Sequence, residues 1–577
     1  MQLKNTLEIS PLSGNIPFFA AATTSKDPAQ NHSCSRYRDN IDYFPMTSSS
    51  QKIVDSNDEL MISQDFGYQS SNNIVSSLDT VTHSSAALVK HEVQPGGSSK
   101  EKSIASRRSR ATHVSQPDFK KDARSIALSV FNMMNLVIGG GVIGLPFAAA
   151  QFGYVGFTMA IFTVVIIACC TQYFNLSAAQ HLERIDPLII PGYEELGYLA
   201  AGNKILGKRI VSAIVMFHTF TCCCAYSFVI RKECGPILAR LINLVSGSET
   251  VNLATLRSDG GVEGRWYLNE KTLVGLFIAF IITPLACLRN VKNLGYTSAI
   301  AIFAIIFFVV TVITQKDFAA GQCPLEYPES CEHCPETTQE CEAHPFRLSS
   351  DAIYSLPTLL FSFECHGTML PIYCDLRRKS KGKMMKIILA SLLLVVSVYT
   401  ITAVFGYFSF FNHVNAEFLL MFEYLKMDSA STEIQVVIAK FMMVLVVTFS
   451  APLFCFVLRK SIFLNIFPEE EPEFIAGKYH YGVTVTIMAI IYCIVVSVED
   501  LKIFFAMGGQ ISATNLMIVF PSLFFIFICH KDKKLSLKTM LPWILIMFGI
   551  FNQTVMTYII VSKELENSAH HGNTTAH

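Results

Sequence analysis

The stretch NLVIGGGVIGLP, residues 135–146, lies inside an apolar segment that runs from about residue 126 to residue 150. It contains the glycine run Gly139–Gly141, a further glycine at Gly144 and a proline at Pro146. In a helix interior glycine costs about 1 kcal/mol relative to alanine, and proline about 3 kcal/mol. We therefore expect the first long apolar helix of this chain to be broken at these residues.

The composition indicates the class of protein that contains this segment. Of 577 residues, 51% are hydrophobic and only 16% are charged, whereas soluble proteins carry about 25% charged residues. Apolar runs long enough to cross a lipid bilayer recur after the first quarter of the chain, which predicts a polytopic membrane protein. The 45 basic residues are balanced by 45 acidic residues, so nothing indicates nucleic acid as a partner. The first such run begins past residue 120, and we expect no amino-terminal signal peptide.

Residues 1–122 differ from the rest of the chain. They are rich in Ser, Asn, Asp and Thr and end in a basic stretch, SRRSRATHVSQPDFKKDARS, at residues 106–125. Such a composition cannot bury enough apolar surface to offset the entropy of ordering, so we predict a disordered cytosolic tail. Its role is either that of a solvated leader that sets the topology or that of a regulatory tail modified on its serines.

Hydrophobic runs of about 20 residues predict eleven helical spans in an all-α transmembrane domain of residues 123–562. They are expected near residues 126–150, 157–178, 210–229, 272–288, 296–313, 352–373, 384–408, 434–458, 481–498, 501–528 and 537–561. Lys and Arg gather in alternate loops, most clearly at Arg377, Arg378, Lys379, Lys381, Lys383 and Lys386. By the positive-inside rule this distribution predicts a cytosolic amino terminus and an outside carboxyl-terminal tail, residues 563–577.

The loop at residues 316–350, which this topology places outside, contains the cysteine-rich stretch GQCPLEYPESCEHCPETTQEC. Its cysteines lie among His333 and His344, so a zinc site is one interpretation. Because an outside loop faces an oxidising compartment, we favour disulfide bonds. The disulfide candidates are Cys323, Cys331, Cys334 and Cys341, with Cys234 at the outer end of the third span as a possible fifth. The sequon at Asn573 is the candidate for glycosylation, whereas the sequon at Asn31 lies on the cytosolic side and should stay unused.

The sixth span is interrupted as well. In SLPTLLFSFECHGTMLPIY, residues 355–373, the polar stretch Ser362–Gly367 contains Glu364 and His366 in the middle of the span. An ionisable residue at this depth should face protein or water rather than lipid. Small residues in a span often serve only close helix packing, but broken helices at corresponding positions of two halves point to a transport site near the bilayer midplane. We therefore predict inverted repeats at about residues 126–313 and 352–528, followed by the eleventh span at 537–561.

Four stretches of the chain resemble one family of transporters. FNMMNLVIGGGVIGLPFAAAQFG and LLFSFECHGTMLPIYCDLRRKSKGKM resemble the first and sixth spans of the sodium-coupled neutral amino-acid transporters, a branch of the amino acid/auxin permease superfamily. WYLNEKTLVGLFIAFIITPLACLRNVKNLGYTSAIAIF resembles their fourth and fifth spans, and VTFSAPLFCFVLRKSI their eighth. The match runs from about residue 125 to residue 561. The resemblance implies a LeuT-type fold of ten core spans and an eleventh span. It also implies a transporter that imports small neutral amino acids, such as glutamine or alanine, by alternating access driven by sodium.

The resemblance also assigns site residues by position. Substrate contacts are expected from Asn135, Gly139, Gly140, Gly141, Phe361, Ser362, Phe363, Glu364 and Cys365. Sodium is expected at Asn135, Ile138, Thr448 and Ser450, although hydroxyl side chains in spans also bond routinely to the carbonyl four residues earlier. No cofactor beyond the coupled ion is expected.

Glu364 departs from the family pattern, in which an apolar or amide residue is usual. Its carboxylate is interpreted in three ways: it takes up a proton and replaces or joins sodium as the coupled ion, it pairs with a cationic substrate, or it is a neutral group hydrogen-bonded to backbone. His366 matches the family, and we expect it to cap the second half-helix. His218 in the third span and His570, His571 and His577 outside titrate near neutrality in principle, but a lone histidine in a span is usually satisfied internally.

The sequence gives less support to three other functions, those of a transceptor, an enzyme and a channel. A transceptor would bind an amino acid and signal through the amino-terminal tail, which contains no recognisable docking motif. We do not expect an enzyme, because adjacent residues such as Cys365 and His366 in an unwound segment point in different directions and form no dyad. A channel would need a repeated filter, and none is visible. We predict residence in the plasma membrane, with the endolysosomal membrane as the alternative.

Overall fold

The computed structural model describes a helical protein. The described residues are 119–185, 191–246, 268–288, 297–325, 341–376, 379–427, 429–466, 477–498, 500–530 and 537–574, and none of them forms a β-strand. The chain divides into two units, Met1–Asp65 and Phe66–His577. The first unit, and with it almost all of the predicted disordered tail at 1–122, lies outside the described residues, so the prediction for the tail stays a prediction.

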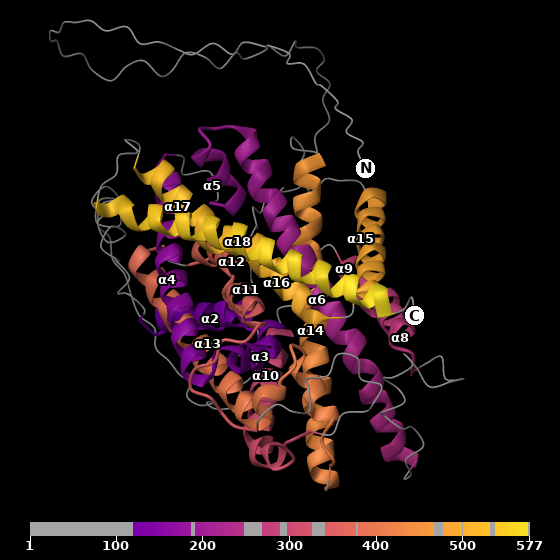
Figure 1. Cartoon of the computed structure of the whole chain (residues 1–577). Helices are drawn as coiled ribbons and strands as arrows, with labels where there is room; N and C mark the ends of the chain where they lie inside the picture. The colour runs from indigo at the N-terminus through magenta and orange to yellow at the C-terminus, as the bar shows by residue number, and fades with distance from the viewer. Residues whose placement is uncertain are drawn as a thin grey trace, which may run out of the picture. The chain divides into compact units, whose positions relative to one another are not determined.

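The described helices follow one another as a long series (Figure 1). Their bounds are α2 (Phe119–Val137), α3 (Gly141–Phe152), α4 (Tyr154–Ile185), α5 (Tyr193–Ala200), α6 (Ile205–Ser246), α8 (Glu270–Phe277), η2 (Ile278–Ile282), α9 (Thr283–Ala286), α10 (Thr297–Ala320), α11 (Ala352–Phe363), α12 (His366–Cys374), α13 (Lys381–Phe410), η4 (Phe411–His413), η5 (Phe418–Glu423), α14 (Ala430–Ile466), α15 (Gly477–Ser497), α16 (Leu501–Met507), η6 (Gly508–Ala513), η7 (Asn515–Val519), α17 (Phe520–Phe524), η8 (Phe525–Cys529) and α18 (Leu537–Thr574).

These helices confirm an all-α polytopic membrane protein. Among the described residues, eight helical segments are long and apolar enough to cross a membrane. The remaining three predicted spans correspond to α2 with α3, to α8 with η2 and α9, and to α11 with α12, each of which is divided into shorter pieces. The two breaks predicted from the glycine run and from the polar stretch are therefore present. The inverted repeat itself stays a prediction.

Two helices extend beyond their predicted ends. α6 continues to Ser246, although its apolar run ends near residue 229, and α18 continues to Thr574 through part of the predicted carboxyl-terminal tail. The extension of α6 contains charged side chains, and these can be buried because they have partners of opposite charge on other elements. Lys440 on α14 lies 3.0 Å from Glu233 on α6, and both side chains are 1% exposed. Buried ion pairs of this kind are tolerated in a protein interior only when each charge is compensated.

More charges join this cluster around α6 and α14. Lys440 also forms an ion pair with Glu423, the last residue of η5. Arg240 on α6 lies 3.4 Å from Glu423 and 3.6 Å from Glu433. Ion pairs therefore connect the extended end of α6 to α14 and to η5 before it. Hydropathy alone does not predict these connections.

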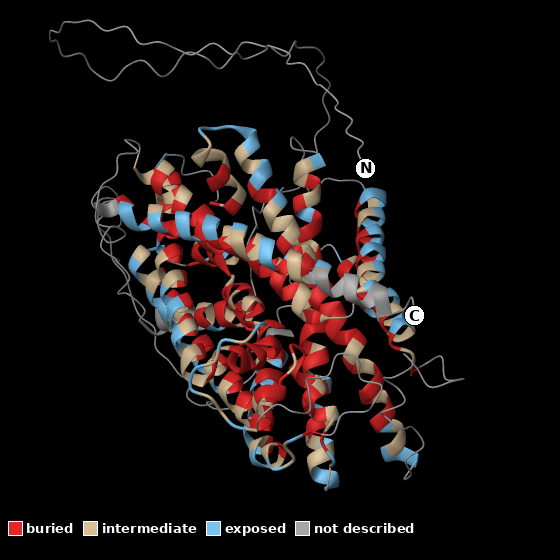
Figure 2. Cartoon of the chain, in the orientation of Figure 1, coloured by how far each residue is buried: buried red, intermediate tan, exposed pale blue. Residues whose placement is uncertain are grey.

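The interior is arranged around the broken helices. α3 packs against both α11 and α13, and α6 packs along α14, with α10 between α13 and α14. Buried residues concentrate along α3, α11 and the middle of α6 (Figure 2). α3 is buried at every position from Gly141 to Gln151. The first break thus lies in the interior of the protein rather than at its surface.

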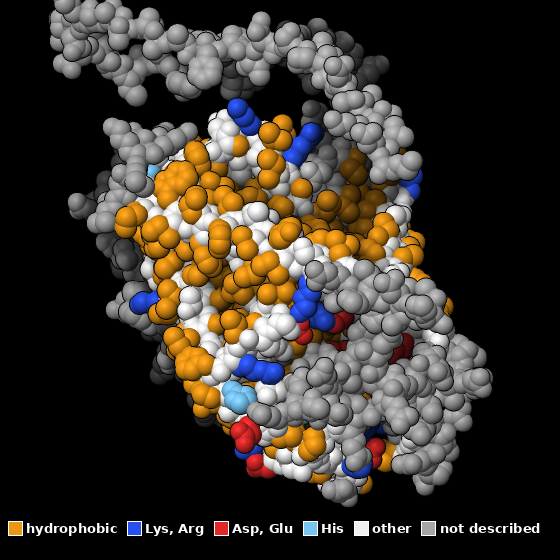
Figure 3. All heavy atoms as spheres, in the orientation of Figure 1, with side chains coloured by type: hydrophobic (Ala, Val, Ile, Leu, Met, Phe, Trp, Pro, Cys, Tyr) orange, Lys and Arg blue, Asp and Glu red, His pale blue; other side chains and the backbone are white. Residues whose placement is uncertain are grey.

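The outward surface is apolar. Met547 and Phe551 on α18 are 67% and 66% exposed, and Ile166 on α4 and Phe303 on α10 are also largely exposed. Hydrophobic side chains cover the face of the protein that α18 crosses (Figure 3). Apolar side chains that cover so much of one face are rare on soluble proteins and are typical of a surface that contacts lipid.

Candidate substrate site at two broken helices

The first break releases backbone carbonyl groups. In a continuous helix the N–H groups of Gly139 and Gly140 would donate to the carbonyl oxygens four residues earlier, those of Asn135 and Leu136. Instead, the Gly139 N–H donates to the carbonyl oxygen of Val137 at 2.9 Å, and the Gly140 N–H donates to the hydroxyl of Tyr226 at 3.4 Å. The carbonyl oxygen of Asn135 is consequently free of the helical ladder.

A second carbonyl is released by the same change. The N–H of Val142 donates to Gly139 at 3.4 Å rather than to Ile138. The released carbonyl of Ile138 is one of the groups that the family resemblance assigns to sodium. The side chain of Asn135 is half-buried, and its Oδ1 is a buried atom without a hydrogen-bond partner among the described residues.

The glycines are required by close packing. A Cβ atom at Gly139 would collide with the hydroxyl of Tyr226, and one at Gly140 would lie 2.6 Å from its Cε1 atom. A Cβ atom at Gly141 would lie 2.5 Å from Oγ of Ser362, across on α11. The glycine run therefore allows both α6 and α11 to touch the first break, and it brings two of the predicted site residues, Gly141 and Ser362, together.

The second break lies at Glu364 and Cys365, between α11 and α12. The N–H of His366 donates to Oε1 of Glu364 at 3.0 Å, so the Glu364 carboxylate caps the first turn of α12. The expectation that His366 caps this half-helix is therefore wrong. The His366 ring instead points toward α4, where its Nε2 lies 2.9 Å from the hydroxyl of Thr171.

The other carboxylate oxygen of Glu364 has a different partner. Its Oε2 lies 3.2 Å from Nε2 of His218 on α6, and the two side chains are 9% and 8% exposed. The His218 ring also contacts Phe361 on α11, with ring centroids 5.4 Å apart. Both oxygens of this carboxylate are thus engaged within the protein, which neither the polar stretch nor the span histidine indicated by itself.

Tyr399 on α13 joins the two breaks. Its hydroxyl lies 2.8 Å from the carbonyl oxygen of Val137 and 3.2 Å from that of Ser362. These carbonyls belong to the last turns of α2 and α11. Because last-turn carbonyls have no partner within their own helix, the buried Tyr399 satisfies one group on each broken helix.

The remaining predicted substrate residues, Phe361, Phe363 and Cys365, contact different neighbouring helices. Phe361 packs against Phe505 on α16 as well as His218, with ring centroids 5.5 Å apart for the two phenylalanines. Phe363 packs against the ring of Tyr399 and is fully buried. Cys365 accepts a hydrogen bond from Nε2 of Gln172 on α4 at 3.1 Å. Phe363 and Cys365 therefore face neighbouring helices α13 and α4, which fits packing better than substrate contact.

The far end of α12 is fastened to α4. The Tyr373 hydroxyl donates to Glu183 at 3.1 Å, and Lys379 lies 3.0 Å from the same carboxylate. Burial alone would lower the pKa of Lys379, but the hydrogen bond to Glu183 and other nearby groups raise it above its usual value. The ion pair with Glu183 therefore favours the charged form of Lys379 beside the end of α12.

The two sodium candidates on α14 are not equivalent. α14 runs unbroken from Ala430 to Ile466, and side chains two residues apart on a helix do not share a face. Thr448 is buried, whereas Ser450 is half-buried. The Thr448 hydroxyl donates to the carbonyl of Val444 at 2.6 Å, which leaves its oxygen lone pairs available as an acceptor.

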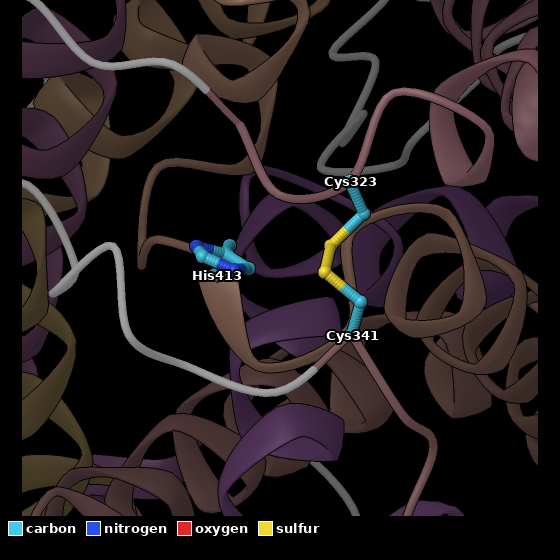
Figure 4. A group of neighbouring side chains, drawn as sticks. All are labelled: Cys323, Cys341 and His413. Atoms are coloured by element: carbon cyan, nitrogen blue, oxygen red, sulfur yellow. A yellow bond between two sulfur atoms is a disulfide. The ribbon is translucent and has the colours of Figure 1, made fainter.

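The cysteine-rich loop contains one described disulfide, Cys323–Cys341. The ring of His413 lies beside it (Figure 4), and the ligand atoms of the three residues lie within 4.8 Å of one another. Cysteine binds zinc as a thiolate, and a disulfide offers none, so the described cluster does not fit a zinc site. Cys234 on α6 packs against the core and pairs with no described cysteine, so its part in a disulfide stays a prediction. Cys331, Cys334, His333 and the side chain of Asn573 lie outside the described residues.

Sequence reasoning missed Tyr226, Tyr399 and Ser512 as neighbours of the two breaks. Tyr226 follows three cysteines in an apolar run, and Tyr399 lies in the apolar seventh span. Such residues look like ordinary packing residues in a span. Ser512 lies on η6, 3.0 Å from Nδ1 of His218, and a serine at that position gives no local signal in the sequence.

The family model for transmembrane amino acid transporter protein matches residues 123–562. This match covers well over half of the chain, and the chain therefore belongs to the transmembrane amino acid transporter family. The match also coincides with the transmembrane domain that hydropathy predicted. The family accordingly indicates a transporter of amino acids.

Proposed function

We propose that the protein moves small neutral amino acids, such as glutamine or alanine, across a membrane by alternating access coupled to sodium. The observation that carries this proposal is the meeting of the two broken helices, at which Gly141 touches Ser362. Unwound backbone within a membrane is tolerated where it serves a buried polar function. Broken helices in this arrangement are the usual location of a transport site.

The substrate backbone would be held at the first break. The N–H groups of the glycine run lie at the start of α3, where the helix dipole favours a carboxylate. The Tyr226 hydroxyl already lies on the Gly140 N–H and would form part of the same carboxylate contact. The released carbonyl oxygens at the end of α2 carry the opposite partial charge and suit the substrate ammonium group or a cation.

Sodium would take hard oxygen ligands. The carbonyl of Ile138, the unpartnered Oδ1 of Asn135 and the Thr448 hydroxyl are oxygen donors of the kind that small hard cations prefer. Ser450 is the weaker candidate because it does not share a face with Thr448. The four assigned ligands are therefore reduced to three in this proposal.

The state of Glu364 supports a neutral substrate. Both of its oxygens already have donors, from His218 and from the His366 N–H. A cationic substrate would have to displace His218 to pair with it. Proton coupling through Glu364 and amino-acid sensing through the amino-terminal tail remain the alternative functions.

The test is uptake of labelled alanine or glutamine into proteoliposomes with an imposed sodium gradient. We expect accumulation that collapses when choline replaces sodium. Equal uptake in choline that follows a pH gradient would contradict sodium coupling and favour the proton alternative. Tight binding without flux would contradict transport and favour a sensor.

We also propose a plasma-membrane location. The amino terminus would be cytosolic, because the basic loops alternate with loops that are nearly free of Lys and Arg. Surface biotinylation of intact cells would detect the protein in that location. A protein that is labelled only after permeabilisation and that co-fractionates with lysosomal membranes would contradict it.

A further inference from the structure

His218 is placed between three elements that meet at the second break. It belongs to α6, its Nε2 faces Oε2 of Glu364 at 3.2 Å, and its Nδ1 lies 3.0 Å from the hydroxyl of Ser512 on η6. The ring packs on Phe361 of α11, and the thiol of Cys222 lies 3.6 Å from its Nε2. The histidine and the glutamate are both more than nine-tenths buried as side chains.

The hydrogen-bond partners determine the protonation of the ring. A serine hydroxyl has one hydrogen, and that of Ser512 is directed at the carbonyl oxygen of Gly508, 2.5 Å away. The Ser512 oxygen can therefore only accept from Nδ1 of His218, which must carry a hydrogen. Nε2 faces Oε2 of Glu364, and one hydrogen lies between these two atoms; we assign it to Nε2, with the carboxylate ionised. A ring with hydrogens on both nitrogens is an imidazolium, so the pair consists of a cation and an anion.

The neighbouring histidine shows the opposite pattern. The hydroxyl of Thr171 donates to the carbonyl of Ile167 at 2.9 Å, so Nε2 of His366 must donate to Thr171. Its Nδ1 is a buried atom with no partner among the described residues, as suits a neutral ring whose second nitrogen is an acceptor. The charge that balances Glu364 therefore comes from His218 and not from His366.

We propose that His218 is the residue that makes this transporter select amino acids with uncharged side chains. This inference rests on the proposed function and deepens it. The imidazolium occupies the position at which a lysine-like or arginine-like substrate would pair with Glu364, and it leaves the pair without net charge. An unpaired buried charge is strongly unfavourable, so removal of either partner creates a demand for a substrate of compensating charge.

The two partners then have opposite predicted effects. His218→Ala leaves a buried carboxylate, and we expect lysine, arginine and ornithine to become substrates. The ratio of lysine to alanine kcat/KM should rise at least tenfold. Glu364→Gln removes the anion that holds the buried His218 ring in its charged form, and we expect aspartate or glutamate, whose side-chain carboxylate can take that place, to gain over alanine in the same way. The double variant His218→Ala/Glu364→Gln removes both charges and should return the preference to neutral amino acids.

The experiment uses the full-length protein in proteoliposomes and measures uptake of labelled alanine, lysine and glutamate for each variant. His480→Ala is the matched control, because His480 is a buried span histidine that bonds to the carbonyl of Cys287 at 3.1 Å, and it should leave all ratios unchanged. A folded His218→Ala protein that takes up alanine with no gain for lysine would overturn the proposal. If that variant does not fold, Glu364→Gln decides, and the absence of any gain for glutamate would overturn the proposal equally.

The wild-type protein separates this inference from the function on which it rests. Failure of the wild type to take up any neutral amino acid would contradict the proposed function. Wild-type uptake of alanine, together with unchanged charge preference in both single variants, would contradict only the role of His218.

Discussion

The hydroxyl of Tyr399 lies 2.8 Å from the carbonyl oxygen of Val137, at the end of the first half of a broken helix. The same hydroxyl lies 3.2 Å from the carbonyl oxygen of Ser362, at the end of the first half of the other. One side chain on α13 therefore spans both breaks. A hydroxyl has a single hydrogen, so the two carbonyls share it, and a movement of either helix changes the bond to the other.

This relationship predicts the effect of Tyr399→Phe. The phenyl ring preserves the packing against Phe363 but leaves the Ser362 carbonyl without its donor, while the Val137 carbonyl keeps only the Gly139 N–H. We expect the free energy of unfolding to fall by about 1–3 kcal/mol, the cost of an unsatisfied buried polar group, and the uptake rate to fall more than binding. Thermal unfolding in detergent and initial uptake rates measure the two effects. Tyr481→Phe, on an exposed side chain of α15, is the control, and an uptake rate of Tyr399→Phe equal to that control would refute the coupling.

A second prediction uses the contact between the glycine run and Tyr226. Gly139→Ala places a methyl group on the Tyr226 hydroxyl, whereas the next atom of that ring, Cζ, lies 3.4 Å away. We therefore expect Gly139→Ala to abolish uptake and Tyr226→Phe, which deletes the hydroxyl, to restore part of it. Gly140→Ala should not be rescued, because its methyl group would lie 2.6 Å from a ring carbon that phenylalanine retains.

Uptake of labelled alanine, with surface expression measured in parallel, tests this pair of variants. Gly482→Ala is the control, since a Cβ atom there meets nothing within 4 Å. Equal rescue of both glycine variants by Tyr226→Phe would show that the collision does not explain their loss. If Tyr226→Phe rescued neither glycine variant, the glycines would be needed for some reason other than leaving room for the Tyr226 ring.

Much of the fold follows from the sequence, because apolar runs and poor helix formers are local signals. Hydropathy located the spans, and the glycine run and the polar stretch located both breaks. The extension of α6 could not be predicted in this way, since Glu233 and Arg240 look like loop residues until Lys440 and Glu423 are placed beside them. The same reason applies to Tyr399, whose role depends on carbonyls far away in the sequence.

The buried charges on α6 and α14 lead to a third prediction. Lys440→Met removes the cation shared by Glu233 and Glu423 while it keeps most of the side-chain volume. Loss of one partner from a buried ion pair costs about 3–5 kcal/mol, and we expect a correspondingly large drop in thermal stability. Lys563→Met is the matched control, because the Lys563 pair with Asp351 is partly exposed and such pairs contribute about 0–1 kcal/mol. Similar stability for both variants would contradict a buried network at α6.

The last prediction concerns the sodium ligands on α14. Thr448→Val preserves the shape of the side chain but removes its oxygen, and Ser450→Ala removes an oxygen from a different face of the same helix. If sodium lies between Thr448 and the released carbonyl of Ile138, the sodium concentration for half-maximal uptake should rise at least tenfold in Thr448→Val. It should change less than twofold in Ser450→Ala. The measurement is alanine uptake at graded sodium concentrations, with total ionic strength held constant by choline. A larger shift in Ser450→Ala would place the ion on the other face of α14, and no shift in either variant would remove α14 from the site.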